Sequence, residues 1–209
     1  MSESLYVVGR YPPPIDGQAI ASRQLADLLE EEYDVERVDL APDESGGSGA
    51  NVRFDGRRAL AYARHRWSLP RRLEARPDAP ILWTAISPTA LGHLRDRTIV
   101  LPALPADRPV VAIVHWGNFD RLFRSSLTGW SARRMIDRLQ AVVLLSPHLS
   151  ERLAPWIPDE KRHVIPNTLD PEARCRASEV EAKIERRSEE PSRPLRLLFL
   201  SNMTPSKGY

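Results

Sequence analysis

The chain has 209 residues, of which 42% are hydrophobic, and its 30 Lys and Arg nearly balance its 28 Asp and Glu. This composition is typical of a globular protein with one sizeable core, since domains run to about 100–200 residues. No apolar run approaches the roughly 18 residues of a membrane-spanning helix, and the N-terminus shows no secretory signal, so we expect a cytoplasmic protein.

Short apolar runs alternate with amphipathic stretches along the chain. The runs predict strands at residues 5–8, 81–86, 110–114, 141–145, 163–165 and 195–200, and the alternating segment 35–40 predicts an edge strand. Several runs are apolar at consecutive positions, as in strands that helices cover on both faces. The order strand, helix, strand, helix therefore predicts a doubly wound α/β domain with a mostly parallel, Rossmann-like sheet.

Three amphipathic stretches predict helices between these strands. The expected buried positions are Ala21, Leu25, Leu28 and Leu29 in the first helix, Leu60, Ala63 and Trp67 in the second, and Ala132, Met135, Ile136 and Leu139 in the third. Two further helix starts are predicted at Ser87-Pro88 and Ser146-Pro147, because serine caps a helix and proline fits its first turn.

The composition changes after Asp170. Arg and Glu dominate residues 171–194, which predicts a charged helix and a linker that contribute little to a core. We therefore expect three parts: a Rossmann-like domain over residues 1–170, the helix and linker over 171–194, and the first strand and loop of a further domain over 195–209.

Charge is unevenly distributed. Residues 26–44 carry nine acids against one arginine, whereas residues 53–76 carry eight arginines, among them Arg64 and Arg66, against two acids. This arginine strip is either a solvated helix face or a dock for an anionic surface, such as acidic lipid headgroups or a phosphorylated acceptor. A nucleic-acid partner is not expected, because few stacking aromatics interrupt the strip and the whole chain is near neutral.

Ligands of open α/β sheets bind outside the carboxyl ends of the strands, so the residues just after each strand are the first candidates for a site. The loop from Gly9 to Gln18 follows the first strand and contains Arg10, Asp16 and Gly17. Gly17 either lets backbone N–H groups approach an anion at a helix N-terminus or makes a plain turn. The loop lacks the glycine spacing of a dinucleotide-binding motif.

The second candidate is His115, which directly follows the apolar run at 110–114 and precedes Trp116. An imidazole there can donate or accept a hydrogen bond and titrates near neutrality; the alternative is a structural histidine. The other histidines lack metal-ligand spacing and Cys175 is the only cysteine, so no metal is expected. The third candidate segment begins at Asn167, whose alternative role is to stabilise a turn.

Taken together and in this order, these segments resemble the amino-terminal half of a family 4 glycosyltransferase, a two-domain enzyme of the GT-B fold. The resemblance is carried by Asp16-Gly17 ahead of the first helix, by His115, by residues 164–170 and by residues 198–208. Asp16 stands in place of the family's first loop glycine, Thr168 replaces a later glycine, and Asn202 stands where an arginine is frequent, whereas the companion Lys207 is kept.

The resemblance implies that a sugar moves from a nucleotide-sugar donor to a sugar, lipid-linked or small-molecule acceptor, with retention of configuration and without a required metal or other cofactor. It further implies polysaccharide or glycolipid synthesis. The implied contacts are His115 in the catalytic gap, Asp16, Gly17, Gln18, Asn202, Lys207 and Gly208 toward the donor, and Arg10, Trp116 and Asn167 toward the acceptor. The arginine strip, with Arg64 and Arg66, adds an anionic membrane surface as an expected partner, which would place the cytoplasmic protein at the inner face of the membrane.

The family's donor-binding motif, two glutamates separated by seven residues, would lie beyond Tyr209. We therefore expect residues 1–209 alone to be inactive. The competing interpretation is a non-catalytic, Rossmann-like regulatory or binding module whose working surface is the arginine strip. A reading frame that continues past Tyr209 favours the enzyme, and a stop codon there favours the module.

Overall fold

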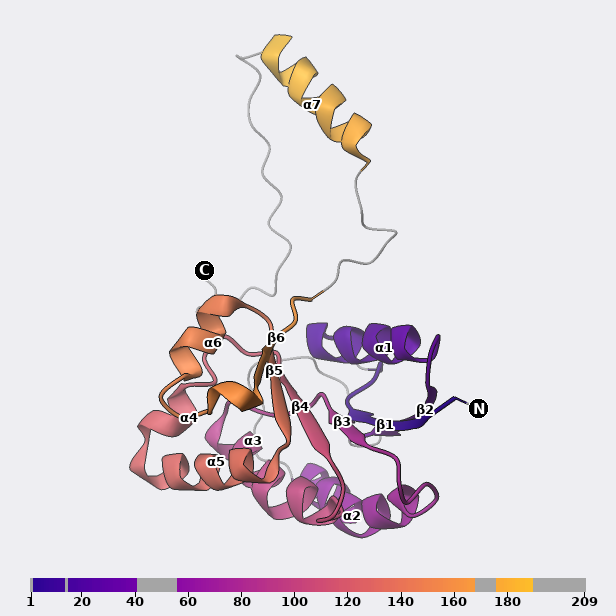
Figure 1. Cartoon of the computed structure of the whole chain (residues 1–209), viewed down its shortest axis with the longest axis vertical. Coiled ribbons are helices and arrows are strands. Elements are labelled where there is room, and N and C mark those ends of the chain that lie inside the picture. Colours follow the sequence, from indigo (N-terminus) through magenta and orange to yellow (C-terminus); the bar gives the residue numbers. More distant parts are fainter. Residues whose placement is uncertain (1, 14, 41–55, 168–175, 190–209) are drawn as a thin grey trace. The chain divides into compact units, whose positions relative to one another are not determined.

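The structure is a computed structural model that describes residues 2–13, 15–40, 56–167 and 176–189 (Figure 1). The chain divides into two units, residues 1–167 and residues 168–209. The strand expected at 195–200, together with Asn202, Lys207 and Gly208, lies outside the described residues.

The first unit is built on a six-stranded, all-parallel sheet in the order β2-β1-β3-β4-β5-β6. The strands are β1 (Ser4–Gly9), β2 (Asp34–Asp39), β3 (Ile81–Trp83), β4 (Val110–Val114), β5 (Ala141–Leu144) and β6 (Arg162–Val164). This arrangement confirms the predicted α/β fold class, and β2 lies at the expected edge. The strand predicted over 81–86 ends early, at Trp83.

Helices connect successive strands. They are α1 (Gly17–Leu29), α2 (Gly56–Leu73), α3 (Ala90–Arg95), α4 (Arg121–Arg124), α5 (Ser126–Arg138) and α6 (Pro147–Leu153), with a π-helical turn η1 (Asp96–Val100) and 3-10 turns η2 (Leu101–Ala103) and η3 (Asp159–Lys161). Figure 1 shows α1 on one side of the sheet and α2, α3 and α5 on the other. Right-handed crossovers explain this, because the chain moves outward from β1 to β2 and then back past β1 to β3.

The larger core lies on the side of α2 and α5. The alternation along β1 sends Tyr6 and Val8 into this core and Val7 into a smaller cluster beneath α1. Trp83 and Met135 are fully buried in the larger core. A large side chain of this kind contributes about 2 kcal/mol when it leaves water, so this side of the sheet supplies most of the stability.

The predicted buried face of α5 is confirmed, since Ala132, Met135, Ile136 and the following Leu139 are all buried. The face predicted for α1 is correct only in part, since Leu29 packs against the smaller cluster whereas Leu28 is 51% exposed. The fully buried residues of α1 are Ala19, Ser22 and Ala26. Small residues face the sheet here because α1 approaches the ends of β1 and β3 closely.

The face predicted for α2 is also wrong. Leu60 and Trp67 point to solvent, whereas Leu69 and Leu73 near the end of the helix are buried. The physical reason is a long-range contact: Tyr6 of β1 is buried below this end of α2, and its hydroxyl donates to the carbonyl of Arg72 at 2.9 Å. That contact sets the rotation of the helix, and no local pattern reveals it.

One of the two predicted serine caps is confirmed. Ser146 Oγ accepts from the Leu149 N–H at 3.2 Å at the start of α6. Ser87 does not cap α3, which begins at Ala90 and is capped by Thr89. Ser87 is instead held in the preceding loop, because its backbone N–H donates to the carboxylate of Asp96 at 2.8 Å.

The end of α5 is closed by a side chain from another element. Lys161 of η3 donates from Nζ to the carbonyls of Ile136, Asp137 and Leu139, at 3.1, 3.1 and 2.7 Å. Carbonyls at a helix C-terminus lack partners within the helix, and a cation is favourable there. This contact fastens the segment that leads into β6.

In the second unit, α7 (Ala177–Glu189) is a charged helix with no buried residue. No helix within the described ranges is both long and apolar enough to cross a membrane.

Candidate functional site

The strand order reverses between β1 and β3. The chain leaves β1 toward β2 and returns to pair β3 with the other side of β1. In open parallel sheets, ligands bind at such a reversal, outside the carboxyl ends of the two strands. The loop after β1 and the segment after β3 therefore form the first part of the candidate site.

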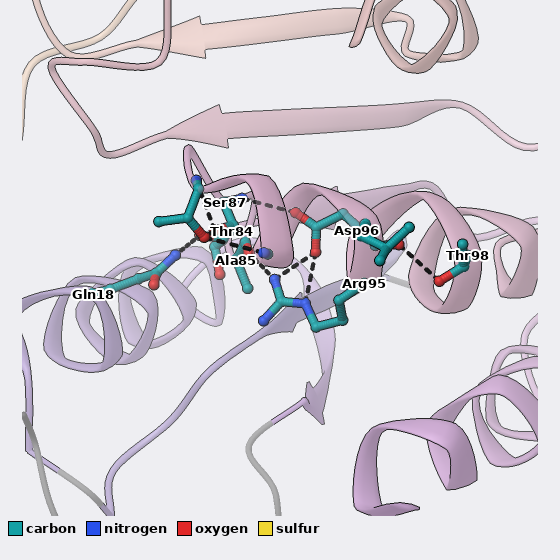
Figure 2. Close-up of polar contacts among 10 residues, drawn as sticks. Gln18, Thr84, Ala85, Ser87, Arg95, Asp96 and Thr98 are labelled. Carbon is teal, nitrogen blue, oxygen red and sulfur yellow. Dashed lines mark hydrogen bonds and ion pairs between the residues drawn. The ribbon is translucent and has the colours of Figure 1, made fainter. Parts of the chain in front are cut away.

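These two segments are joined tightly. Gly9 ends β1, and a Cβ there would lie far inside contact distance of Thr84 Oγ1 and 3.2 Å from Ser22 Oγ. Ser22 and Thr84 are fully buried, with their hydroxyl oxygens 2.7 Å apart. Gln18 donates from Nε2 to the carbonyl of Thr84 at 2.9 Å (Figure 2). The predicted site residue Gln18 thus anchors α1 to the end of β3.

Asp16 holds the N-terminus of α1. Its Oδ1 accepts from the Ala19 N–H at 2.9 Å, and its Oδ2 pairs with Arg10 Nη2 at 2.9 Å. Both carboxylate oxygens are therefore engaged within the chain, and this role explains why an aspartate precedes the helix. Gly17 is exposed, and a Cβ there would meet nothing within 4 Å, so the backbone beside Asp16 is open to a ligand.

Arg10 has an unused donor. Its Nε is buried and has no hydrogen-bond partner, although its Nη2 pairs with Asp16. Buried polar groups are nearly always hydrogen-bonded in folded proteins. The Nε itself is enclosed, but the Arg10 side chain as a whole is 27% exposed and can meet an anionic or hydroxyl-bearing ligand.

The segment after β3 is fixed by a buried acid that the sequence pattern does not reveal. Asp96 is fully buried, and it accepts from the Ser87 N–H at 2.8 Å and from Arg95 Nε at 2.8 Å. Arg95 Nη2 also donates to the carbonyl of Ala85 at 2.9 Å (Figure 2). Burial raises the pKa of Asp96 to about 6, against the opposing effects of Arg95 and the Ser87 N–H. The network makes the loop between β3 and α3 rigid.

His115 directly follows β4, the next strand along the sheet. Its ring is half-buried, and its Nε2 is enclosed without a hydrogen-bond partner. Burial lowers the pKa of His115, so the ring is neutral at pH 7. Because neighbouring strands lie about 4.8 Å apart, the ends of β1, β3 and β4 span about 10 Å, which suits a sugar-sized ligand.

Ion pairs and hydrogen bonds with Arg124 and Arg152 hold the loop that follows His115. Asp120 is almost fully buried and accepts from Arg152 Nη2 and from Arg124 Nε, the latter at 3.0 Å. The hydrogen bond from Arg152 is the main reason that the pKa of Asp120 lies below its usual value. Arg152 also donates to the carbonyl of Gly117 at 2.8 Å. Within this braced loop, Trp116 is 43% exposed and free to stack on a ligand.

The remaining predicted residues lie outside the group formed at the ends of β1, β3 and β4. Asn167 is exposed beyond β6, which lies two strands from β4 on the side away from β1. Arg64 and Arg66 lie on α2, which covers a face of the sheet, with Arg64 exposed and Arg66 half-buried. These two arginines are therefore not gathered with His115. Within the described part of the chain, no group of His, Cys, Asp and Glu is arranged to hold a metal ion.

A hollow of about 420 Å³ lies at the opposite edge of the sheet, where β4 begins. Its lining includes Arg108, Pro109, Asp137 and Gln140. Because these residues lie at the amino end of β4 and next to the start of β5, the hollow is separate from the site around His115. We therefore base the candidate site on the carboxyl edge.

Comparison with models of protein families identifies the family of the chain. The family model described as Glycosyltransferase Family 4 matches residues 15–173, about three quarters of the chain. A search of curated proteins finds no match. The matched region includes Asp16, Gln18, His115 and Asp120, and so takes in most of the candidate site.

Proposed function

The chain belongs to glycosyltransferase family 4, and on that premise we propose that it forms the acceptor-side lobe of an enzyme that moves a sugar from a nucleotide-sugar donor to an acceptor with retention of configuration. The observation that carries the proposal is the position of Arg10, His115 and Trp116 directly after β1 and β4, with the side chains of Arg10 and Trp116 27% and 43% exposed. These residues flank the strand reversal at which ligands of such sheets bind.

In the proposed reaction, the acceptor hydroxyl oxygen bonds to the anomeric carbon as the bond from that carbon to the donor phosphate breaks. The departing phosphate oxygen takes the hydroxyl proton, so no protein base is required. The nucleoside diphosphate gains negative charge as it leaves, and preorganised donors stabilise such charge. The Gly17 backbone, Asn202, Lys207 and Gly208 are the proposed hydrogen-bond donors to the leaving diphosphate.

The proposed role of His115 is to bind the sugar or the acceptor. Since burial keeps the ring neutral, it offers one donor and one acceptor nitrogen at physiological pH. Trp116 supplies an exposed aromatic face beside it, and Arg10 and Asn167 are further proposed acceptor contacts. Asp16 and Gln18 act through position, because their side chains hold the N-terminus of α1 against Thr84.

We further propose that the acceptor belongs to polysaccharide or glycolipid synthesis on the cytoplasmic side, and that Arg64 and Arg66 contribute to an anionic contact surface. We also propose that the nucleotide of the donor is held by the family's second domain. Purified residues 1–209 are therefore expected to show no sugar transfer and weak or no binding of nucleotide sugars in calorimetry.

The test is His115→Ala, made in a chain that includes the donor-binding domain. Release of nucleoside diphosphate is measured with a panel of UDP- and GDP-hexoses and simple glycoside acceptors. We expect kcat/KM to fall by about a hundredfold or more, the scale of losing one preorganised hydrogen bond at a reacting centre. His163→Ala is the matched control, since His163 is exposed on the edge strand β6. Activity near wild type in H115A would remove His115 from the site.

A further inference from the structure

A hollow of about 420 Å³ opens at the amino edge of the sheet, beside the starts of β4 and β5. Two short segments line it, residues 107–110 and residues 137–140. We call it the amino-edge hollow. Its volume falls within the range of about 300–1,000 Å³ that is usual for small-molecule sites. Because strand residues rise by about 3.3 Å each, the hollow lies about 15–20 Å from His115, at the other end of β4.

The amino-edge hollow contains a buried arginine that lacks a counter-ion. Arg108 is only 8% exposed, and its Nη1 is enclosed without a hydrogen-bond partner among the described residues. By contrast, Arg95 and Arg162, whose side chains are 15% and 12% exposed, each pair with an aspartate. Within the described part of the chain no such ion pair is found for Arg108. A buried charge without a partner costs folding free energy, so this guanidinium is suited to an anion from outside the chain.

The charge of Arg108 acts on the hollow although Nη1 itself is enclosed. A guanidinium shares its charge over its three nitrogens, and Arg108 is one of the lining residues. Opposite charges attract more strongly beside a protein interior than in bulk water. Carboxylate and phosphate groups are the anions whose geometry matches a guanidinium. The amino-edge hollow therefore favours an oxyanion.

Two further cations lie at the amino-edge hollow. Arg138 lines it, is half-buried, and is held by a hydrogen bond from its Nη2 to a backbone carbonyl. Lys161 Nζ donates to the carbonyls of Asp137 and Leu139, at 3.1 and 2.7 Å, and both of these residues line the hollow. Together with Arg108 these side chains place three positive charges beside the hollow.

The lining also carries groups that bind hydroxyls. Asp107, Asp137 and Gln140 are all exposed and all line the hollow. The two carboxylates accept hydrogen bonds from hydroxyl groups, and the glutamine amide both donates and accepts. The same carboxylates repel additional negative charge. The lining therefore favours a ligand with one oxyanion group and several hydroxyls over a polyanion.

We propose that the amino-edge hollow binds a small hydroxylated molecule with one oxyanion group, of the class of sugar phosphates and sugar acids. The oxyanion lies against the guanidinium of Arg108, and the hydroxyls contact Asp107, Asp137 and Gln140. The inference does not depend on the proposed function, because the site is distant from His115 and its ligand undergoes no reaction there.

The experiment is an NMR titration of the 209-residue chain, in which backbone amide shifts are followed at constant ionic strength. The probes are glucose 6-phosphate, glucuronate, inorganic phosphate and glucose. We expect saturable shifts at Val110, Leu139 and Gln140 with one or both of the anionic sugars, and none with glucose. The tighter of the two anionic sugars identifies the oxyanion as phosphate or carboxylate.

The position of the shifts separates this inference from the proposed function. Shifts confined to His115 and Trp116 would overturn the amino-edge site and support a sugar site at the carboxyl edge. No saturable shift at Val110, Leu139 and Gln140 with either anionic sugar, or shifts as large with glucose, would also overturn the amino-edge site.

Arg108→Met tests the guanidinium. Methionine keeps an unbranched stem and removes the charge, so we expect the dissociation constant of the tighter anionic sugar to rise about tenfold or more. Stability in urea without ligand should not fall, because the variant removes a buried cation that has no partner. Arg121→Met is the matched control, since Arg121 is exposed on α4, and it should leave the affinity unchanged. Wild-type affinity in R108M contradicts the proposal.

Asp107→Asn combined with Asp137→Asn tests the hydroxyl contacts at two exposed positions that leave the fold intact. The backbone carbonyl that accepts from Lys161 remains in this variant. Inorganic phosphate should bind more tightly, because two repelling charges are gone, and the preference for the anionic sugar over inorganic phosphate should shrink. An unchanged ratio of the two affinities contradicts the proposed contacts.

Urea unfolding gives a second measurement that does not need assigned spectra. A ligand that binds only the folded chain raises its stability, so the tighter anionic sugar should raise the urea midpoint of the wild-type chain and of R121M. It should raise the midpoint of R108M much less. Equal increases in R108M and R121M would contradict binding at Arg108.

Discussion

The hydroxyl oxygens of Ser22 and Thr84 lie 2.7 Å apart, and neither side chain is exposed to solvent. This hydrogen bond joins α1 to the end of β3 at the point where the strand order reverses. Two buried hydroxyl groups that hydrogen-bond to each other cost little free energy of folding, whereas either one alone would be a buried polar group without a partner. The geometry of the candidate site therefore depends on how closely α1 approaches the sheet.

Gly9→Ala tests that approach. The added Cβ would collide with Thr84 Oγ1 and crowd Ser22 Oγ, so we expect the free energy of unfolding in urea to fall by about 1–3 kcal/mol. Gly17→Ala is the control, because a Cβ there has open space and no special backbone conformation. Equal losses in the two variants would contradict a specific close approach at Gly9.

Asp16→Ala tests the cap of α1. It removes the hydrogen bond to the Ala19 N–H and the pair with Arg10, and we expect a loss of about 1 kcal/mol in unfolding free energy. Asp16→Asn keeps a capping oxygen and loses only the charge, so it should lose less. A loss as large in D16N as in D16A would mean that the ion pair, and not the cap, carries the effect.

Much of the architecture is predictable from sequence, because apolar runs and amphipathic stretches alternate and dictate a layered α/β fold. The rotation of α1 and α2 is not predictable in this way. Leu28 and Trp67 fit a local helical pattern, yet both are exposed. The faces of α1 and α2 that pack on the sheet depend instead on contacts with Gly9, Thr84 and Tyr6, which belong to other elements.

The same limit applies to the candidate site. His115 is found from sequence because it directly follows a strand. Asp120 is not, because its buried carboxylate is explained by Arg152, 32 residues later. Asp96 is likewise hidden in a charged stretch whose sequence suggests an exposed helix, although the side chain is fully buried.

Asp120→Ala tests the brace behind His115. The variant leaves Arg152 and Arg124 without their shared partner, and we expect about 2 kcal/mol of destabilisation in urea, since one end of the pair is buried and the other meets solvent. The ring resonances of His115 in NMR should shift as well. Asp159→Ala is the control: this acid is 94% exposed and pairs with Arg162, and its loss should cost under about 0.5 kcal/mol.

The contribution of two buried histidines to stability should decrease as the pH falls below about 6.5, the ordinary pKa of histidine. Burial lowers the pKa of both His115 and His93, and Arg97 lowers that of His93 further. In this pH range the unfolded chain binds protons that the folded chain does not, so acid favours unfolding. Urea unfolding from about pH 8 to pH 5 measures the slope of stability against pH, and His115→Gln should reduce that slope.

The contribution of Asp96 to stability changes with pH in the opposite direction. Its pKa rises from 3.8 to about 6 on folding, so its contribution to stability is complete at low pH and is lost as the pH rises through 6. Carboxyl carbon shifts in NMR should show Asp96 titrating near pH 6. Titration of Asp96 near pH 4 would contradict the desolvated, buried position of its side chain.

Only three of the chain's 30 basic residues are lysines, and one of them is Lys161, whose ammonium group serves three carbonyls at the end of α5. A tetrahedral –NH₃⁺ directs its three hydrogens along a cone, whereas a flat guanidinium spreads five hydrogens within a plane. Arginine, so abundant elsewhere in this protein, is therefore the wrong shape for this position. At this position a single nitrogen contacts three converging carbonyl oxygens, and this geometry explains why a lysine stands here in a chain that otherwise uses arginine.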